Sequence, residues 1–214
     1  MKVVVLIAAS YLIGSISFAL VIAKLQGIDL REIGSGNLGA TNLARACGKK
    51  WAYLCFLLDV LKGFVPSFAA KLFILSDSAT PATLALWLAV GVAAIFGHIF
   101  PFYLKFKGGK GVATSFGVVL GMWPYYAIPG LIVFVLWAVI VLIWRYISLG
   151  SVVAAAVFPV IMIVMTAILK NWRFDILWPL IVAAVVLCSL VIILHRANIK
   201  RLLAGTEHKI FQRK

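Results

Sequence analysis

Long apolar runs separated by short polar segments dominate the chain. Runs of roughly 20 apolar residues are long enough for one helical crossing of a bilayer, and five occur, at Val3–Ala23, Ala52–Leu75, Thr83–Tyr103, Leu149–Leu169 and Ile176–Leu194. A further apolar stretch over 112–144 is interrupted by Gly121, Pro124, Pro129 and Gly130. Because such residues break helices, this stretch predicts two helices, the first of them short. The pattern predicts an all-α bundle of about seven transmembrane helices.

Composition supports an integral membrane protein. The 214 residues are 64% apolar and 12% charged, whereas soluble domains are about 45–50% apolar and about 25% charged. We expect one domain spanning 1–214, with the first run retained as a span because no cleavage site for a signal peptide follows it. The 3 cysteines are odd in number and lack metal-ligand spacing, so neither a disulfide framework nor a metal site is expected.

The basic residues predict the orientation in the membrane. Lys and Arg number 20 against 6 Asp and Glu, a net charge of +14. With seven spans, one side receives 15 of them: Lys24, Arg31, Arg45, Lys49, Lys50, Lys105, Lys107, Lys110, Arg145, Arg196, Lys200, Arg201, Lys209, Arg213 and Lys214. The other side receives Lys2, Lys71, Lys170 and Arg173. The positive-inside rule then places the N-terminus outside and the C-terminus in the cytoplasm.

Four polar clusters fall on this expected cytoplasmic side, and the first is "GSGNLGATNLARACGKK" at 34–50. Glycines permit close approach to a ligand, and Arg45 offers a two-pronged hydrogen-bond donor for phosphate. The candidate substrate-binding side chains in this cluster are Ser35, Asn37, Thr41, Asn42 and Arg45. The alternative is a turn-rich loop between helices. The segment contains no phosphate-binding P-loop motif.

The second cluster is "GHIFPFYLKFKGGKGVATSFG" at 97–117. Successive amides of Gly108, Gly109 and Gly111 predict an anion-binding nest, helped by a helix that starts near Val112. Lys107 and Lys110 add positive charge. Anchoring to anionic lipid headgroups is an alternative for the lysines, but it leaves the glycines unexplained.

Two further clusters are shorter. "RYISLGS" at 145–151 offers Ser148 and Ser151, with helix capping as the alternative for Ser148. "HRANIKRLLAGTEHK" at 195–209 places His195 and Asn198 on one helical face, followed by Arg201 and by Glu207, which is expected to pair with a nearby cation. A basic amphipathic tail is the alternative for this last segment.

Inside the second apolar run, two charged residues three positions apart predict an ion pair. Asp59 and Lys62 would face each other on one helix, and buried charges in a bilayer are costly unless paired. A structural pair that braces the glycine-rich loop is favoured over direct contact with a ligand. His98 lies in the third run, where a helix-packing donor and a site residue are both open interpretations.

Together these groups describe a pocket for a phosphorylated, hydroxylated small molecule beside apolar helices that hold an acyl chain, which points to acyl transfer. A transporter for an anionic metabolite is the main alternative, although the polar clusters gather on one side. A phosphotransferase that binds metal through aspartates is disfavoured, since only 6 acidic residues occur. No His is followed by Asp at the spacing that acyl-CoA-dependent acyltransferases use.

The four clusters, in this order and spacing, resemble the motifs of the bacterial PlsY-type glycerol-3-phosphate acyltransferases over nearly the whole chain. The resemblance implies a seven-span enzyme of the bacterial inner membrane. We expect a monomer among membrane lipid, with its active site facing the cytoplasm. It implies acyl phosphate as donor, glycerol-3-phosphate as acceptor, and neither cofactor nor nucleic acid. Lys110, Ser148, His195 and Asn198 are the expected catalytic residues. The expected substrate-binding residues are Ser35, Asn37, Thr41, Asn42, Arg45, Lys107, Gly108, Gly109, Gly111, Ser151, Arg201 and Glu207.

Overall fold

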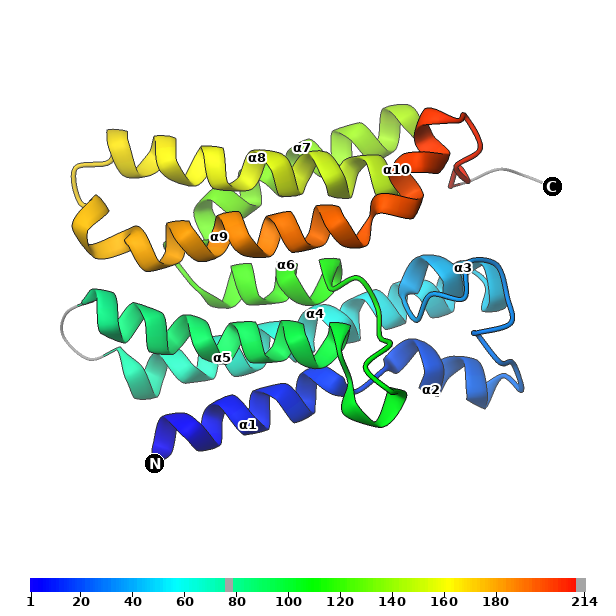
Figure 1. Ribbon diagram of the computed structural model, residues 1–214, viewed down its shortest axis with the longest axis horizontal. Coiled ribbons are helices and arrows are strands. Elements are labelled where there is room, and N and C mark those ends of the chain that lie inside the picture. Colours follow the sequence, from blue (N-terminus) through cyan, green and yellow to red (C-terminus); the bar gives the residue numbers. More distant parts are fainter. Residues whose placement is uncertain (76–78, 211–214) are drawn as a thin grey trace. The chain divides into compact units, whose positions relative to one another are not determined.

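The computed structural model describes residues 1–75 and 79–210, and this part of the chain is helical without a strand (Figure 1). Arg213 and Lys214, two of the 15 basic residues expected on the cytoplasmic side, lie outside the described residues. The elements are α1 (Lys2–Ser15), α2 (Phe18–Leu25), α3 (Ala40–Cys47), α4 (Lys49–Ile74), α5 (Pro81–Ile99), η1 (Phe102–Leu104), α6 (Val112–Gly121), α7 (Ala127–Trp144), α8 (Ile147–Ile168), α9 (Phe174–Leu194) and α10 (Arg196–Leu203).

The predicted spans are confirmed as helices. Within the described residues, 6 helical segments are long and apolar enough to cross a membrane, and α6 is a shorter apolar helix of 10 residues. The stretch 112–144 does form two helices, α6 and α7, with the break between Gly121 and Ala127. The all-helical class and the short fourth helix are therefore as predicted, while the orientation in the membrane stays a prediction.

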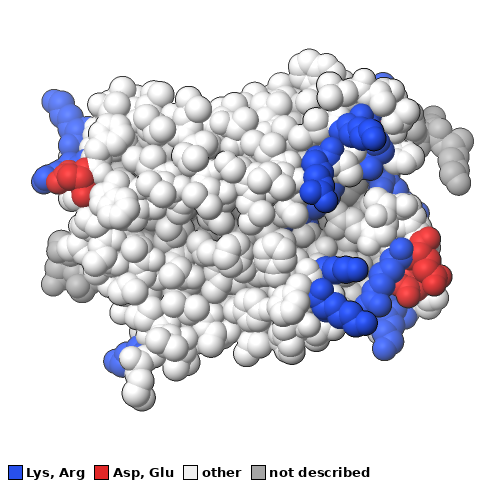
Figure 2. Space-filling model, in the orientation of Figure 1, with Lys and Arg blue, Asp and Glu red and all other residues white. Residues whose placement is uncertain are grey.

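The helices group into two compact units. The first comprises residues 1–75 and 86–122, and the second comprises residues 79–85 and 123–210, as far as the structure describes them. On the face shown in Figure 2, uncharged side chains cover the length of the helices and charged side chains gather near helix ends. This distribution fits helices whose middle sections meet lipid and whose ends meet water.

Small residues let the helices of the first unit pack closely. A Cβ at Gly117 of α6 would overlap the carbonyl oxygen of Val60 in α4, so those two backbones touch. In the same way Gly14 of α1 lies against the backbone of Ala94 in α5. Such close approach is the usual basis of helix association in membranes.

The first span is broken, which the sequence pattern did not predict. The expected helix over Val3–Ala23 ends at Ser15 and restarts at Phe18. The carbonyl of Ser15 accepts a hydrogen bond from the Tyr103 hydroxyl at 2.5 Å, and the carbonyl of Ile16 accepts one from Lys62 Nζ at 2.7 Å. These side chains satisfy carbonyls that the break releases, as a break inside a membrane requires.

The second unit is built from α7, α8 and α9, which lie side by side in Figure 1. Tyr126, just before α7, donates its hydroxyl to the carbonyl of Leu180 in α9 at 2.5 Å. The Tyr126 ring also meets Phe158 of α8 edge to face, with 5.3 Å between ring centroids. One buried aromatic residue therefore contacts both neighbouring helices, and α10 follows α9 after a single residue.

Candidate active site

The loop between α2 and α3, residues 26–39, is organised by the buried side chain of Asn42. Its Nδ2 donates to the carbonyls of Leu30 and Ile33 at 3.1 and 2.9 Å, and its Oδ1 accepts from the Ser35 amide at 3.1 Å. Asn42 is 2% exposed. The side chain thus replaces backbone partners across the loop, as Asn commonly does in turns.

The other candidates of this segment lie around that frame. Gly34 has φ of 60°, and a Cβ there would approach Asn42 Oδ1 closely, so glycine is required by both conformation and space. Ser35, Thr41 and Arg45 are exposed and Asn37 is half-buried. The exposed hydroxyls and the guanidinium are therefore accessible to a ligand from solvent.

The glycine loop, defined here as residues 107–111, is fastened to the end of α5. The Gly108 amide donates to the carbonyl of Ile99 at 3.0 Å, and the Gly109 amide donates to the carbonyl of His98 at 3.1 Å. Side chains at these two positions would overlap those carbonyls or the His98 ring. Two of the amides expected in an anion nest are thus used within the protein, and these glycines serve close packing.

The far end of the glycine loop starts α6. Gly111 has φ of 79° and precedes the first residue of α6, and its carbonyl accepts from the Ser115 amide at 2.7 Å. Lys107 is exposed and Lys110 is half-buried. Two cations therefore lie within the five positions before the first residue of α6, where backbone amides and the helix dipole favour an anion.

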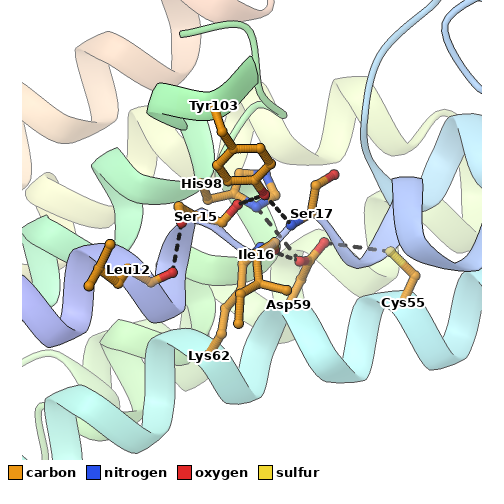
Figure 3. A network of polar contacts seen from close by, with 9 residues as sticks. All are labelled: Leu12, Ser15, Ile16, Ser17, Cys55, Asp59, Lys62, His98 and Tyr103. Carbon is orange, nitrogen blue, oxygen red and sulfur yellow. Dashed lines mark hydrogen bonds and ion pairs between the residues drawn. The ribbon is translucent and has the colours of Figure 1, made fainter. Parts of the chain in front are cut away.

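Beneath the loop, the predicted ion pair within α4 is present (Figure 3). Lys62 Nζ lies 2.6 Å from Asp59 Oδ1, and His98 Nδ1 of α5 lies 3.7 Å from the same oxygen. All three residues are buried. The pair contacts His98 and the carbonyl of Ile16 at the break of the first span.

In the second unit, four predicted residues meet in what we call the Glu207 cluster: Ser148, Asn198, Arg201 and Glu207. Glu207 Oε1 accepts from Ser148 Oγ at 2.8 Å and from Asn198 Nδ2 at 2.7 Å, while Oε2 accepts from Arg201 Nε at 2.6 Å. The expected pairing of Glu207 with a cation is confirmed. Ser148 is the second residue of α8 and makes no capping hydrogen bond.

The charge of Glu207 is stabilised by its partners. Burial opposes ionisation, but the hydrogen bonds from Asn198, Arg201 and Ser148 outweigh it and hold the pKa of Glu207 below its usual range. The carboxylate is therefore negative at neutral pH. It fixes the rotamers of a hydroxyl and an amide that were both predicted to act in catalysis.

His195 lies at the junction of α9 and α10 and is buried. Its Nδ1 lies 2.8 Å from the carbonyl oxygen of Val191. Since a carbonyl only accepts, Nδ1 carries the proton, and in the neutral ring Nε2 is the nitrogen with acceptor character. Ser151, by contrast, donates to the carbonyl of Ile147 within α8 and accepts from Trp137 Nε1.

Sequence reasoning did not identify two contacts that shape these sites. Tyr103 spans the break of the first span, since it donates to Ser15 and accepts from the Ser17 amide at 3.2 Å. The Ile210 amide donates to the carbonyl of Arg145 at 2.7 Å and holds Ile210 at the α7–α8 junction. The position of Tyr103 within the second polar cluster, 97–117, was the available signal, whereas a backbone contact leaves none in the sequence.

The fold and these clusters define a multi-pass helical membrane protein that gathers cations, hydroxyls and amides near helix ends. A family model described as glycerol-3-phosphate acyltransferase matches residues 4–205. The chain belongs to the glycerol-3-phosphate acyltransferase family. This membership decides between the enzyme and the transporter in favour of the enzyme.

Individual relatives match almost end to end. A glycerol-3-phosphate acyltransferase of Aquifex aeolicus is 43% identical over 98% of this chain and 100% of its own length. One of Trichlorobacter lovleyi is 46% identical over 95% of each chain. The crystal structure of PlsY, an integral membrane glycerol 3-phosphate acyltransferase, in its glycerol 3-phosphate form is 41% identical over 99% of this chain and 100% of its own, with a TM-score of 0.82. Its lysophosphatidic acid form gives a TM-score of 0.79 at 40% identity, over 98% of this chain and 95% of that one.

Proposed function

We propose that the protein transfers a fatty acyl group from acyl phosphate to the 1-hydroxyl of glycerol-3-phosphate. The hydroxyl oxygen bonds to the acyl carbon, the bond from that carbon to the phosphate oxygen breaks, and the hydroxyl proton ends on the released phosphate. The products are 1-acyl-glycerol-3-phosphate, a lysophosphatidic acid, and inorganic phosphate. The observation that carries the proposal is the near full-length match to a solved enzyme described in a glycerol 3-phosphate form and a lysophosphatidic acid form.

Acyl phosphate as donor suits the residues available. A mixed anhydride is already activated, so the protein need not supply a strong base or a covalent nucleophile. The sequence has no His followed by Asp at the spacing of acyl-CoA-dependent enzymes. Catalysis then rests on holding two substrates in reacting geometry, which is worth several orders of magnitude in rate.

The first unit supplies groups for phosphate. Arg45 offers paired donors from an exposed position of α3, and Lys110 offers a cation two positions before α6. Lys107, Ser35, Asn37 and Thr41 add charge and hydrogen bonds to these two positions. Asn42 and the glycines at 108, 109 and 111 hold the loops that carry them.

The second unit supplies groups for the alcohol and the carbonyl. Ser148 and Asn198 are held by Glu207, and the bond from Nδ1 of His195 to the Val191 carbonyl fixes the orientation of the imidazole. We assign these three residues to orienting the glycerol hydroxyl and polarising the acyl carbonyl. Arg201 and Ser151 support them.

Two proton acceptors are compatible with this arrangement. In the first, the phosphate of the donor takes the hydroxyl proton as it leaves. In the second, Nε2 of His195 takes the proton as a general base. His195→Ala separates them: residual turnover that external imidazole does not raise supports acceptance by phosphate, whereas loss of turnover that imidazole restores supports His195.

We further propose that the protein acts as a monomer of one domain in the bacterial cytoplasmic membrane, with its active site facing the cytoplasm. Fifteen of the 20 basic residues fall on one side under the seven-span arrangement, which supports this orientation. The reaction as written needs no cofactor, metal or nucleic acid. Among the described residues, no group of three or more His, Cys, Asp or Glu is arranged to hold a metal ion.

The test is a two-substrate assay on purified protein, with glycerol-3-phosphate and palmitoyl phosphate in a metal-free buffer. Release of inorganic phosphate that requires both substrates is the expected result. Lys110→Ala should lower turnover by at least about a hundredfold, whereas Lys2→Ala, which removes a lysine at the start of α1, should not. Equal turnover with palmitoyl-CoA in place of palmitoyl phosphate would refute the proposal that acyl phosphate is the donor.

A further inference from the structure

Three buried ionisable groups in the first unit are not used by the reaction as proposed. Asp59 is 2% exposed, Lys62 4% and His98 7%. Figure 3 shows them converging on the Asp59 carboxylate from α4 and α5. Burying such groups in a membrane protein is costly, and ionisable residues in membrane spans usually have a function.

One side of this network is fixed by the backbone of the first span. Lys62 Nζ lies 2.6 Å from Asp59 Oδ1 and donates to the carbonyl of Ile16 at 2.7 Å. Cys55 Sγ lies within hydrogen-bond range of the other carboxylate oxygen, at 3.6 Å. The Asp59 carboxylate is thus held from two directions and presents a fixed edge toward α5.

The other side of the network reaches the glycine loop through His98. The ring places Nδ1 3.7 Å from Asp59 Oδ1. The adjoining edge of the ring, Nε2 and Cε1, lies so close to Gly109 that a Cβ there would overlap it, and the Gly109 amide donates to the His98 carbonyl at 3.1 Å. The imidazole therefore fills the space between a fixed carboxylate and the loop backbone.

From these contacts we propose that His98, backed by Asp59 and Lys62, is a positioning residue that sets the place of Gly109 and hence of Lys110. The proposal rests on the proposed function for the role of Lys110. The buried ring, which lies between the Asp59 carboxylate and Gly109, stops the loop from sinking toward α5. The hydrogen bonds of Gly108 and Gly109 to α5 stop the loop from lifting away. The loop is thereby clamped from both directions next to the lysine.

The test combines His98→Ala and Gly109→Ala, singly and together. Each single change should lower kcat by about tenfold or more, because a displacement of about 1 Å at a reacting group costs up to a hundredfold. In the double variant the added methyl group occupies space that the ring has vacated. Its kcat should therefore be at least about fivefold higher than the value expected if the fold-losses of the two single variants multiplied. Losses that simply multiply would overturn the proposal.

Amide hydrogen exchange provides a readout that does not require activity. Peptides covering 106–111 should exchange about tenfold faster in His98→Ala than in the wild type. Ser10→Ala is the matched control, since it removes another buried contact of α5, the 2.6 Å bond from Ser10 Oγ to the Val90 carbonyl, and should leave loop exchange and kcat unchanged. Unchanged loop exchange in folded His98→Ala would also overturn the proposal.

These readouts separate the two hypotheses. A wild type without two-substrate activity contradicts the proposed function, while loop exchange still tests the contact between His98 and Gly109. If His98→Ala does not yield folded protein, His98→Gln replaces it, because the unbranched side chain can turn away from a methyl group at Gly109. Coupling of the same sign is then expected with Gly109→Ala, and its absence counts against the proposal.

Discussion

Glu207 and Ser148 are joined by a 2.8 Å hydrogen bond although 59 positions separate them in the sequence. Through this bond the segment after α10 determines the rotamer of a side chain at the start of α8. Asn198 donates to the same carboxylate oxygen at 2.7 Å. One acidic side chain therefore holds two of the proposed catalytic residues, so a single substitution at Glu207 affects both of them.

Replacing Glu207 with Gln should destabilise the protein by about 1.5–3 kcal/mol at neutral pH, the usual worth of hydrogen bonds to a charged group. The amide still accepts from Ser148 and Asn198, but it loses the ion pair with Arg201. We expect kcat to fall and thermal unfolding to shift to lower temperature. Glu32→Gln, at an exposed position of the first unit, is the control and should change stability by less than about 0.5 kcal/mol.

The pH dependence of this difference follows from the lowered pKa of Glu207. A carboxyl whose pKa is lower in the folded state stabilises the protein above its unfolded pKa, about 4.3 for Glu, and loses that contribution as pH falls through the folded pKa. The gap in unfolding temperature between wild type and Glu207→Gln should stay constant from neutral pH to about pH 4.3 and shrink below it. A gap that closes near neutral pH would refute this account.

The ion pair of α4 gives a third prediction. Lys62→Met leaves the Asp59 charge without its closest partner, 2.6 Å away, and should cost about 3–5 kcal/mol in unfolding free energy. The double variant Asp59→Leu with Lys62→Met buries no charge and should regain most of that loss. If the network positions the glycine loop, the double variant will be more stable than Lys62→Met but will have a lower kcat than the wild type. A double variant less stable than Lys62→Met would contradict the paired-charge interpretation.

The helices were predictable because hydropathy is a local property of the chain. All of the long spans and the division of 112–144 follow from runs of apolar residues and from Gly and Pro. The break at Ile16 was not predictable in the same way, since no Gly or Pro lies between Ser15 and Phe18. Its carbonyls are satisfied by Lys62 and Tyr103, which are 46 and 88 positions away, so the cause is tertiary.

The sequence predicted which residues belong to the candidate site better than it predicted the role of each one. The glycines of the loop 107–111 looked like an anion nest, yet the amides of Gly108 and Gly109 bond to the end of α5. Asn42 looked like a ligand donor, yet its amide frames its own loop. Residue types reveal which hydrogen bonds are possible, whereas the partner of each group depends on packing that a single sequence does not encode locally.

Close packing of α4 and α6 predicts a different cost for the same substitution at two glycines. Gly117→Ser would drive Cβ into the carbonyl oxygen of Val60, and overpacking of this kind costs about 1–3 kcal/mol. Gly39→Ser has open space around the new Cβ and lies at the N-cap of α3, where Ser is favoured. The thermal unfolding temperature in detergent should therefore fall for Gly117→Ser and not for Gly39→Ser. Equal shifts would argue that α4 and α6 are not in backbone contact.

Asn42 offers the last test, which concerns the loop 26–39. Asn42→Asp keeps an acceptor for the Ser35 amide but places negative oxygen against the carbonyls of Leu30 and Ile33, to which the native Nδ2 donates at 3.1 and 2.9 Å. Leaving buried carbonyls without a donor costs about 1–3 kcal/mol, and the loop should open to escape it.

We therefore expect faster amide exchange across 30–37 in Asn42→Asp and a KM for glycerol-3-phosphate raised by about tenfold, since a loop that must be ordered on binding reduces affinity. Asp29→Ala is the matched control, because it removes only the exposed 2.9 Å bond from the Arg31 amide to Asp29 Oδ1 in the same segment. An unchanged KM alongside faster exchange would mean that this loop does not contact the substrate, and the assignment of Ser35 and Asn37 would then have to be withdrawn.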